Sequence, residues 1–129
     1  MTDLQRIIYV EDDEDLRDAV HHILADLEGF ELLSFEDGET AVKRAVEFRP
    51  QLAILDVRLP GMSGPETLVH LRQLEGLQSL DAIFITTLAE PKHRELYEKL
   101  GSLALIPKPI DFSLLANTIR RLWKDKRAA

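Results

Sequence analysis

The stretch Ile7-Ile8-Tyr9-Val10-Glu11-Asp12-Asp13 carries an apolar run directly into three carboxylates. Two later segments have a similar form: Leu52-Ala53-Ile54-Leu55 ends at Asp56, and Leu103-Ala104-Leu105-Ile106 leads into Pro107-Lys108-Pro109. Runs of this length are typical of buried strands. In a parallel α/β sheet, ligands bind beyond the carboxyl ends of the strands, so we expect these charged residues to share one crevice.

Carboxylates packed into one crevice repel one another unless a cation neutralises them. Mg²⁺ is commonly held by one or two carboxylates together with waters and phosphate. The acidic run and the later charged residues therefore indicate a site that handles a divalent metal or a phosphate group.

Amphipathic helical patterns alternate with the apolar runs, so that five strands and five helices are expected. A more polar segment, 31–35, is expected to form an edge strand, and Ile83-Phe84-Ile85 a buried strand that ends in Thr86 and Thr87. Pro65 and Pro91 suit the first turns of the third and fourth helices. The helical core faces are expected at Leu16, Val20, Ile23, Leu24 and Leu27 (ending at Gly29), at Ala41, Val42, Ala45 and Val46, at Leu68 and Leu71, and at Leu115, Ile119 and Leu122.

This alternation predicts an α/β fold in which a parallel sheet is covered by helices on both faces. The 129 residues are expected to form a single domain over 1–129, with a core of about 5–126. The end of the chain at Ala129, shortly after the last helix, favours a protein that works alone rather than a fragment of a longer chain.

The composition excludes several classes of function. The chain has no cysteine, which rules out disulfides, thiolate zinc sites and cysteine nucleophiles. A net charge of −7 argues against nucleic-acid binding. No apolar run approaches membrane-spanning length and no leader precedes the first strand, so a cytoplasmic protein without membrane contact is expected. The basic end, Arg120-Arg121 and 124–127, is interpreted as a solvated last turn that complements the helix dipole.

Taken singly, each charged residue has a simpler interpretation. The run from Glu11 to Asp15 could be an acidic helix start capped by Asp13. Asp56 could cap a loop, Lys108 could be exposed, and Thr86 could be an ordinary strand residue. The conjunction of these residues at the ends of four different strands favours a shared site instead.

Taken together, the segments resemble the receiver domain of two-component response regulators, including those of the chemotaxis type. The resemblance rests on Val10-Glu11-Asp12-Asp13, Leu55-Asp56-Val57-Arg58-Leu59-Pro60-Gly61-Met62-Ser63-Gly64, Thr86-Thr87 and Lys108-Pro109, and it covers nearly the whole chain. It implies a flavodoxin-like (βα)₅ three-layer sandwich with a five-stranded parallel sheet of order 2-1-3-4-5. It also implies a cis bond between Lys108 and Pro109.

The resemblance implies that Asp56 is the phosphoacceptor for a histidine kinase or a histidine phosphotransfer protein. The expected cofactor is Mg²⁺, with Mn²⁺ as a substitute. Glu11 and Asp12 match the family's acidic pair, with Asp12 as the direct metal ligand. Asp56 would be a further ligand, and Arg58 would offer its backbone carbonyl.

Other positions are implied to contact the phosphoryl group. The Thr86 hydroxyl and the Thr87 backbone amide would each bind a phosphoryl oxygen, and Lys108 would pair with another. Such residue types suit phosphoryl transfer, which depends mostly on positioning and charge stabilisation. The domain would act as a switch, not as an enzyme, since it would catalyse only its own phosphorylation and dephosphorylation.

The chain departs from the family at the switch position. Leu105 stands where the family usually has Tyr or Phe, and Thr87 where a small Ala is common, while Arg58 and Leu88 occupy positions that tune the lifetime of the phosphoryl group. We expect Leu105 to stay buried in both states and activation to move Thr86 and the segment 87–91. A downstream protein or a homodimer partner, bound to the face of the fourth helix, fifth strand and fifth helix, would then read the position of that helix.

Three alternatives remain open. A phosphohydrolase of the haloacid-dehalogenase type also uses Asp, Lys and Mg²⁺, but it carries a second Asp where this chain has Arg58. A nucleotide- or flavin-binding module would need a Gly-rich loop after the first strand, where Glu11-Asp12-Asp13 stands instead. The third is a receiver that has lost phosphorylation and only binds partners.

Overall fold

The computed structural model describes residues 3–87 and 91–128. Its strands are β1 (Arg6–Val10), β2 (Glu31–Phe35), β3 (Leu52–Asp56), β4 (Asp81–Thr86) and β5 (Ala104–Pro107). Its helices are α1 (Glu14–His21), which continues as the π-helical η1 (His22–Leu27), then α2 (Gly38–Phe48), α3 (Gly64–Arg72), α4 (Pro91–Lys99) and α5 (Phe112–Ala128). None of the helices in these ranges is long and apolar enough to cross a membrane.

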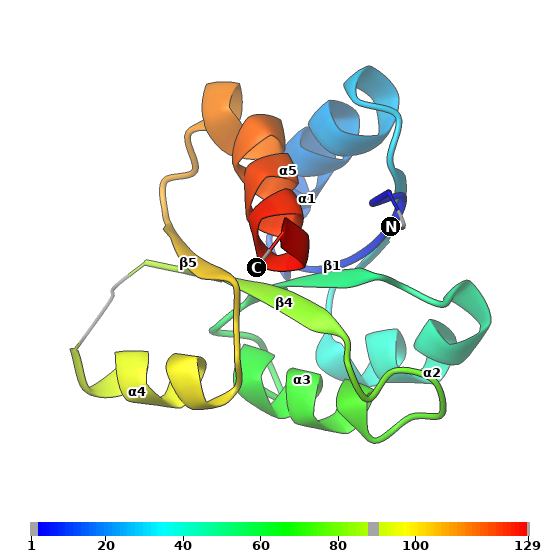
Figure 1. The fold of residues 1–129 in the computed structure, drawn as a ribbon, viewed down its shortest axis with the longest axis vertical. Coiled ribbons are helices and arrows are strands. Elements are labelled where there is room, and N and C mark those ends of the chain that lie inside the picture. Colours follow the sequence, from blue (N-terminus) through cyan, green and yellow to red (C-terminus); the bar gives the residue numbers. More distant parts are fainter. Residues whose placement is uncertain (1–2, 88–90, 129) are drawn as a thin grey trace.

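The five strands form one parallel sheet in the order β2-β1-β3-β4-β5. Helices α1 and α5 lie on one face of the sheet, and α2, α3 and α4 lie on the other (Figure 1). The predicted flavodoxin-like fold, its strand order and the edge position of the polar strand β2 are therefore confirmed.

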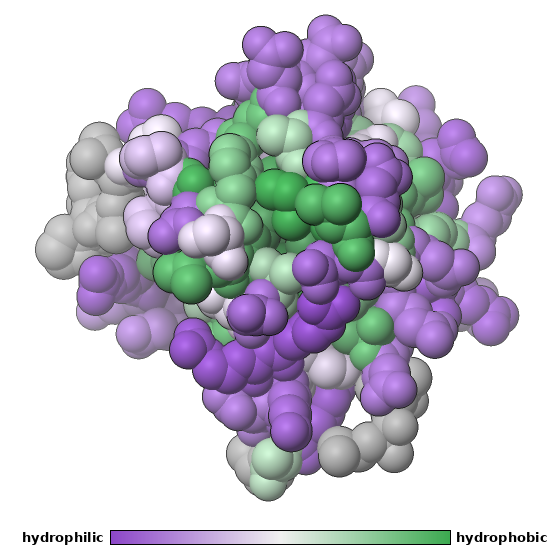
Figure 2. Space-filling model, turned by 90° about the horizontal axis from the view of Figure 1, so that it is seen from above, coloured by the Kyte–Doolittle hydropathy of each residue, from purple (hydrophilic) through white to green (hydrophobic). Residues whose placement is uncertain are grey.

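Alternate residues of the strands supply two apolar cores, one on each face of the sheet. The core under α1 and α5 contains Ile7, Tyr9, Ile54, Ile83 and Trp123, and the other contains Ile8, Leu55, Leu68, Phe84 and Tyr97. Figure 2 looks down on the α1 and α5 side and shows apolar side chains gathered across its centre, with hydrophilic side chains around them.

Local signals in the sequence start the helices where they were expected. Asp13 caps α1, because its side chain accepts a hydrogen bond from the Leu16 amide. Ser63 and Glu66 form a capping box at the start of α3, and Pro65 lies in its first turn. The bond between Lys108 and Pro109 is cis, as predicted.

Two residues that were assigned to helical core faces are exposed. Leu27 is 65% exposed, because the end of the first helix is π-helical: the Glu28 amide donates to the carbonyl five residues back, at Ile23. The wider turn rotates Leu27 out of the apolar stripe, and Phe30 is buried instead. Val46 is 44% exposed, since α2 packs against the sheet through the small side chains of Ala41 and Ala45.

The interpretation of the basic C-terminal end as a solvated turn is wrong for its last residues. Asp81, at the start of β4, is 1% exposed, and its carboxylate forms ion pairs with Lys126 and with Arg127, the latter at 2.7 Å. The Arg127 guanidinium also stacks 3.1 Å from the centroid of the Trp123 ring. A buried carboxylate requires such partners, so these two cations attach α5 to the sheet.

The contacts of Arg127 predict a measurable contribution to stability. Arg127→Ala removes one of the two cations that face Asp81 and the stacking on Trp123, so we expect the free energy of unfolding to fall by about 2 kcal/mol. The matched control is Lys124→Ala, an exposed lysine of the same helix, which should cost well under half as much. Urea unfolding followed by circular dichroism measures both, and equal losses would contradict this role of Arg127.

Candidate active site at the carboxyl edge of the sheet

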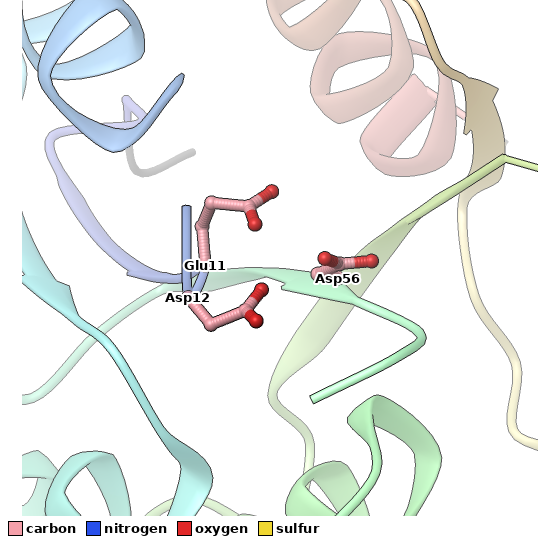
Figure 3. A group of neighbouring side chains, drawn as sticks. All are labelled: Glu11, Asp12 and Asp56. Carbon is pink, nitrogen blue, oxygen red and sulfur yellow. The ribbon is translucent and has the colours of Figure 1, made fainter. Parts of the chain in front are cut away.

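Three carboxylates meet where the two central strands end. Val10 pairs with Leu55 across β1 and β3, so the next residues, Glu11 and Asp56, leave the sheet side by side. One carboxylate oxygen each of Glu11, Asp12 and Asp56 lies within 4.8 Å of the other two. Figure 3 shows the three side chains converging on one space from the ends of β1 and β3.

Lys108 brings a positive charge into this group from the loop after β5. Its ammonium lies 2.9 Å from Asp56 Oδ2, to which it donates a hydrogen bond. It also lies 2.9 Å from Glu11 Oε1, as an ion pair whose angle is poor for a hydrogen bond. The Lys108 amide donates to the Thr86 carbonyl at 2.8 Å, which holds the loop against β4.

Because the site is buried, the pKa values of Glu11 and Lys108 depend on the charges next to them. Glu11 is fully buried and Asp56 is 5% exposed. Burial raises the pKa of Glu11 to about 7, although the Lys108 ammonium and the Asp13 amide oppose this. Burial alone would lower the pKa of Lys108, but the carboxylates of Glu11 and Asp56 outweigh it and raise the pKa. The ammonium is therefore held charged between two carboxylates that have little water.

The backbone around Asp56 is fixed by short-range contacts. The Arg58 amide donates to Asp56 Oδ1 at 3.3 Å, and the Gly64 amide donates to the Val57 carbonyl at 2.9 Å. Gly64 approaches so closely that a Cβ atom there would collide with the Asp56 carbonyl. The start of α3 thus packs directly on the end of β3 and limits the positions that the Asp56 side chain can take.

The remaining predicted site residues lie on β4 and β5. Thr86 is buried at the end of β4, and Thr87 follows it on the surface. Leu105 was expected to be buried, but it is only half-buried. The reason is a hollow of about 470 Å³ that opens beside it, between α4 and β5. Leu88 and most of the segment 87–91 lie outside the described residues.

Arg17 is a residue of the site that sequence patterns do not single out. Its guanidinium donates to the Glu11 carbonyl at 2.8 Å, while the Asp13 amide donates to Glu11 Oε2 at 3.1 Å. These contacts fix the turn between β1 and α1 in which Glu11 and Asp12 stand. No motif marks an arginine at this spacing, so only the fold reveals its role.

The donor set fits a hard divalent cation. All the candidate ligands are oxygens, as Mg²⁺ prefers, and within the part of the chain that the structure describes three carboxylates face a single ammonium. Asp12 is exposed while Glu11 and Asp56 are buried, so the cluster opens to solvent on the side of Asp12. Glu11, Asp12 and Asp56 can therefore attract a cation, and Lys108 can bind an anion next to it.

Comparison with known proteins gives a consistent result. The family model described as response regulator receiver domain matches residues 7–120. The polar-differentiation response regulator DivK of Brucella anthropi is 27% identical over 95% of this chain and 99% of its own length. The transcriptional regulatory protein CpxR of Klebsiella pneumoniae is 32% identical over 94% of this chain, which spans 50% of CpxR.

Solved structures with the same fold include the chemotaxis protein CheY4 of Vibrio cholerae. It superposes with a TM-score of 0.85 at 26% identity, over 92% of this chain and 98% of CheY4. The non-phosphorylated receiver domain of HemR from Leptospira biflexa gives a TM-score of 0.82 at 25% identity, over 92% of this chain and 93% of that domain.

The crowding of carboxylates predicts that one of them destabilises the metal-free protein. Asp12→Asn removes a negative charge from the cluster while keeping the shape of the side chain, so in excess chelator the free energy of unfolding should rise. Asp15→Asn, in the first turn of α1, is the control and should lower it slightly, because it removes a favourable charge from a helix N-terminus. Urea unfolding measures both, and a loss of stability in Asp12→Asn would argue against the repulsion.

Proposed function

Because the chain belongs to the family of response regulator receiver domains, we propose that Asp56 accepts a phosphoryl group from a histidine kinase or a histidine phosphotransfer protein. The observation that carries the proposal is the pairing of the buried Asp56 carboxylate with Lys108, beside two further carboxylates. Receiver domains are signalling components of two-component systems and not enzymes in the usual sense. The phosphorylated aspartate would be the signal.

The transfer uses Asp56 as a nucleophile. A carboxylate oxygen of Asp56 forms the new bond to phosphorus, while the bond between phosphorus and the donor's imidazole nitrogen breaks and the imidazole keeps the electron pair. A carboxylate carries no proton to be removed at neutral pH, so no general base is needed. The contacts of Val57, Arg58 and Gly64 keep the nucleophile in place for an in-line attack.

The acidic residues would hold Mg²⁺ next to this nucleophile. The ligands would be the carboxylates of Asp12 and Asp56 and the backbone carbonyl of Arg58, with Glu11 completing the acidic pair. When bound, Mg²⁺ neutralises the carboxylates and the developing charge on the phosphoryl oxygens. Mn²⁺ would substitute, because it accepts the same oxygen ligands.

Lys108, Thr86 and Thr87 would bind the phosphoryl oxygens. The Lys108 ammonium already donates to Asp56 Oδ2, so it needs only a small shift to pair with a phosphoryl oxygen on that carboxylate. The Thr86 hydroxyl, at the end of β4, would donate to a second oxygen, and the Thr87 backbone amide would donate to a third. Each of these groups would thereby change its contacts once Asp56 carries phosphate.

The output would pass from Lys108 and Thr86 to β5 and α4. Leu105 has no polar group to exchange between core and solvent, so a rotation of its side chain would carry no signal. The hollow beside Leu105 is lined in part by Arg94 and Tyr97 of α4, which leaves room for that helix to move relative to β5. A downstream protein or a second copy of the chain on the α4-β5-α5 face would then detect the position of α4.

The phosphoacceptor assignment predicts a single labelled residue. Incubation with acetyl phosphate and Mg²⁺ should add one phosphoryl group that hydroxylamine removes, since an acyl phosphate is labile to this nucleophile. Asp56→Asn keeps the shape of the side chain but lacks the nucleophile, so intact mass spectrometry should show no label. Asp37→Asn, at the N-cap of α2, is the control and should be labelled like the wild type.

Excess chelator should also abolish labelling of the wild type, because the carboxylates would then repel each other and the donor. Labelling of Asp56→Asn at the wild-type level would refute the assignment of Asp56. Full labelling in chelator would refute the metal site. Steady turnover of a generic phosphatase substrate would favour a phosphohydrolase instead.

A further inference from the structure

Two buried hydroxyl groups on neighbouring strands, those of Tyr9 on β1 and Ser34 on β2, lack a hydrogen-bond partner among the described residues. The Tyr9 side chain is fully buried, so its hydroxyl cannot bind solvent. Buried polar groups are rarely left unpaired, because their desolvation is then uncompensated. A phenylalanine would fill the same space without this cost, so the hydroxyl of Tyr9 requires an explanation.

Tyr9 lies directly below the acidic cluster in the sheet. It stands two residues before Glu11 and pairs with Ile54, which stands two residues before Asp56. Because side chains alternate along a strand, Tyr9 points to the same face of the sheet as Glu11 and Asp56. Burial raises the pKa of the Tyr9 phenol, and the charge of Glu11, followed by that of Asp56, raises it further. The hydroxyl thus keeps its proton close to these carboxylates.

Glu11, on the same face of the sheet as Tyr9, offers an acceptor with a free position. Its Oε2 accepts the Asp13 amide, whereas its Oε1 has the Lys108 ammonium at 2.9 Å but accepts no well-aligned hydrogen bond from a described residue. Under the proposed function, Lys108 turns to the phosphoryl group when Asp56 is phosphorylated. Glu11 completes the acidic pair but is not among the proposed direct ligands of Mg²⁺. Its fully buried carboxylate then loses the adjacent ammonium, which leaves Oε1 open to another donor.

We propose that Tyr9 is a positioning residue that acts through Glu11: its hydroxyl donates to the Glu11 carboxylate when Lys108 moves to the phosphoryl group. The inference rests on the proposed function of Asp56 and Lys108. In the unphosphorylated protein the hydroxyl is unpaired, and in the phosphorylated protein it is paired. The hydrogen bond therefore favours the phosphorylated state over the unphosphorylated one.

The test uses beryllofluoride with Mg²⁺ as a stable mimic of the phosphoryl group, and the affinity of the full chain is measured by isothermal titration calorimetry. Tyr9→Phe should weaken binding about tenfold, the size expected for one hydrogen bond to a charged acceptor. Without beryllofluoride, the same variant should be as stable as the wild type or more stable, because it buries no unpaired hydroxyl. Ser34→Ala is the matched control: it removes the other unpaired hydroxyl, from the residue paired with Tyr9 on β2, and should bind beryllofluoride like the wild type.

A second readout is the nuclear magnetic resonance spectrum of the wild-type protein, with one variant used to assign it. The chain has two tyrosines, so the ¹³Cζ resonance of Tyr9 can be identified with Tyr97→Phe. This resonance should move on addition of beryllofluoride, as the phenol becomes a hydrogen-bond donor. Unchanged affinity in Tyr9→Phe, or an unmoved Tyr9 resonance while beryllofluoride is bound, would overturn the role of Tyr9. Failure of the wild type to bind beryllofluoride would instead overturn the proposed function, and this inference with it.

Discussion

The ion pairs of Lys108 with Glu11 and Asp56 are the interaction on which the rest of the site depends. Two carboxylates with almost no solvent contact stand side by side at the ends of β1 and β3, and this arrangement requires a nearby cation. The Lys108 ammonium supplies that charge from the loop after β5, a strand that lies two strands away from β3 in the sheet. Any group that competes for Lys108, or for the carboxylates, therefore changes the contacts of three strands at once.

The fold serves to keep these charges in place. Parallel strands bring Glu11, Asp56 and Lys108 to one edge of the sheet, and the close approach of Gly64 fixes the backbone of Asp56. At the opposite edge, the pairing of Asp81 with Lys126 and Arg127 holds α5 against the sheet. Like charges repel one another at the site, whereas the ion pairs of Asp81 stabilise the packing of α5. This contrast is typical of proteins in which a functional site is less stable than the rest of the fold.

The fold and the candidate site could be predicted from the sequence, because both depend on the order of residues along the chain. Apolar runs ending in Glu11, Asp56 and Lys108 give the strand order through a family resemblance, and caps such as Asp13 follow local rules. The exposed Leu27 and the pairing of Asp81 with Arg127 could not be predicted, since a π-helical turn and a contact between residues 46 positions apart leave no periodic signal. The roles of Arg17 and Tyr9 likewise follow only from which side chains the sheet brings together.

The most direct test of the central claim is a crystal structure of the protein with Mg²⁺ and beryllofluoride. The account predicts beryllofluoride on the Asp56 carboxylate, with the Lys108 ammonium bonded to a fluorine atom and withdrawn from Glu11 Oε1. Since Lys108 pairs with Asp56 in the unphosphorylated protein and with the phosphoryl group in the proposed active form, its position distinguishes the proposal from a receiver that only binds partners. A structure in which beryllofluoride occupies Asp56 while Lys108 still bridges Glu11 and Asp56 would contradict the account.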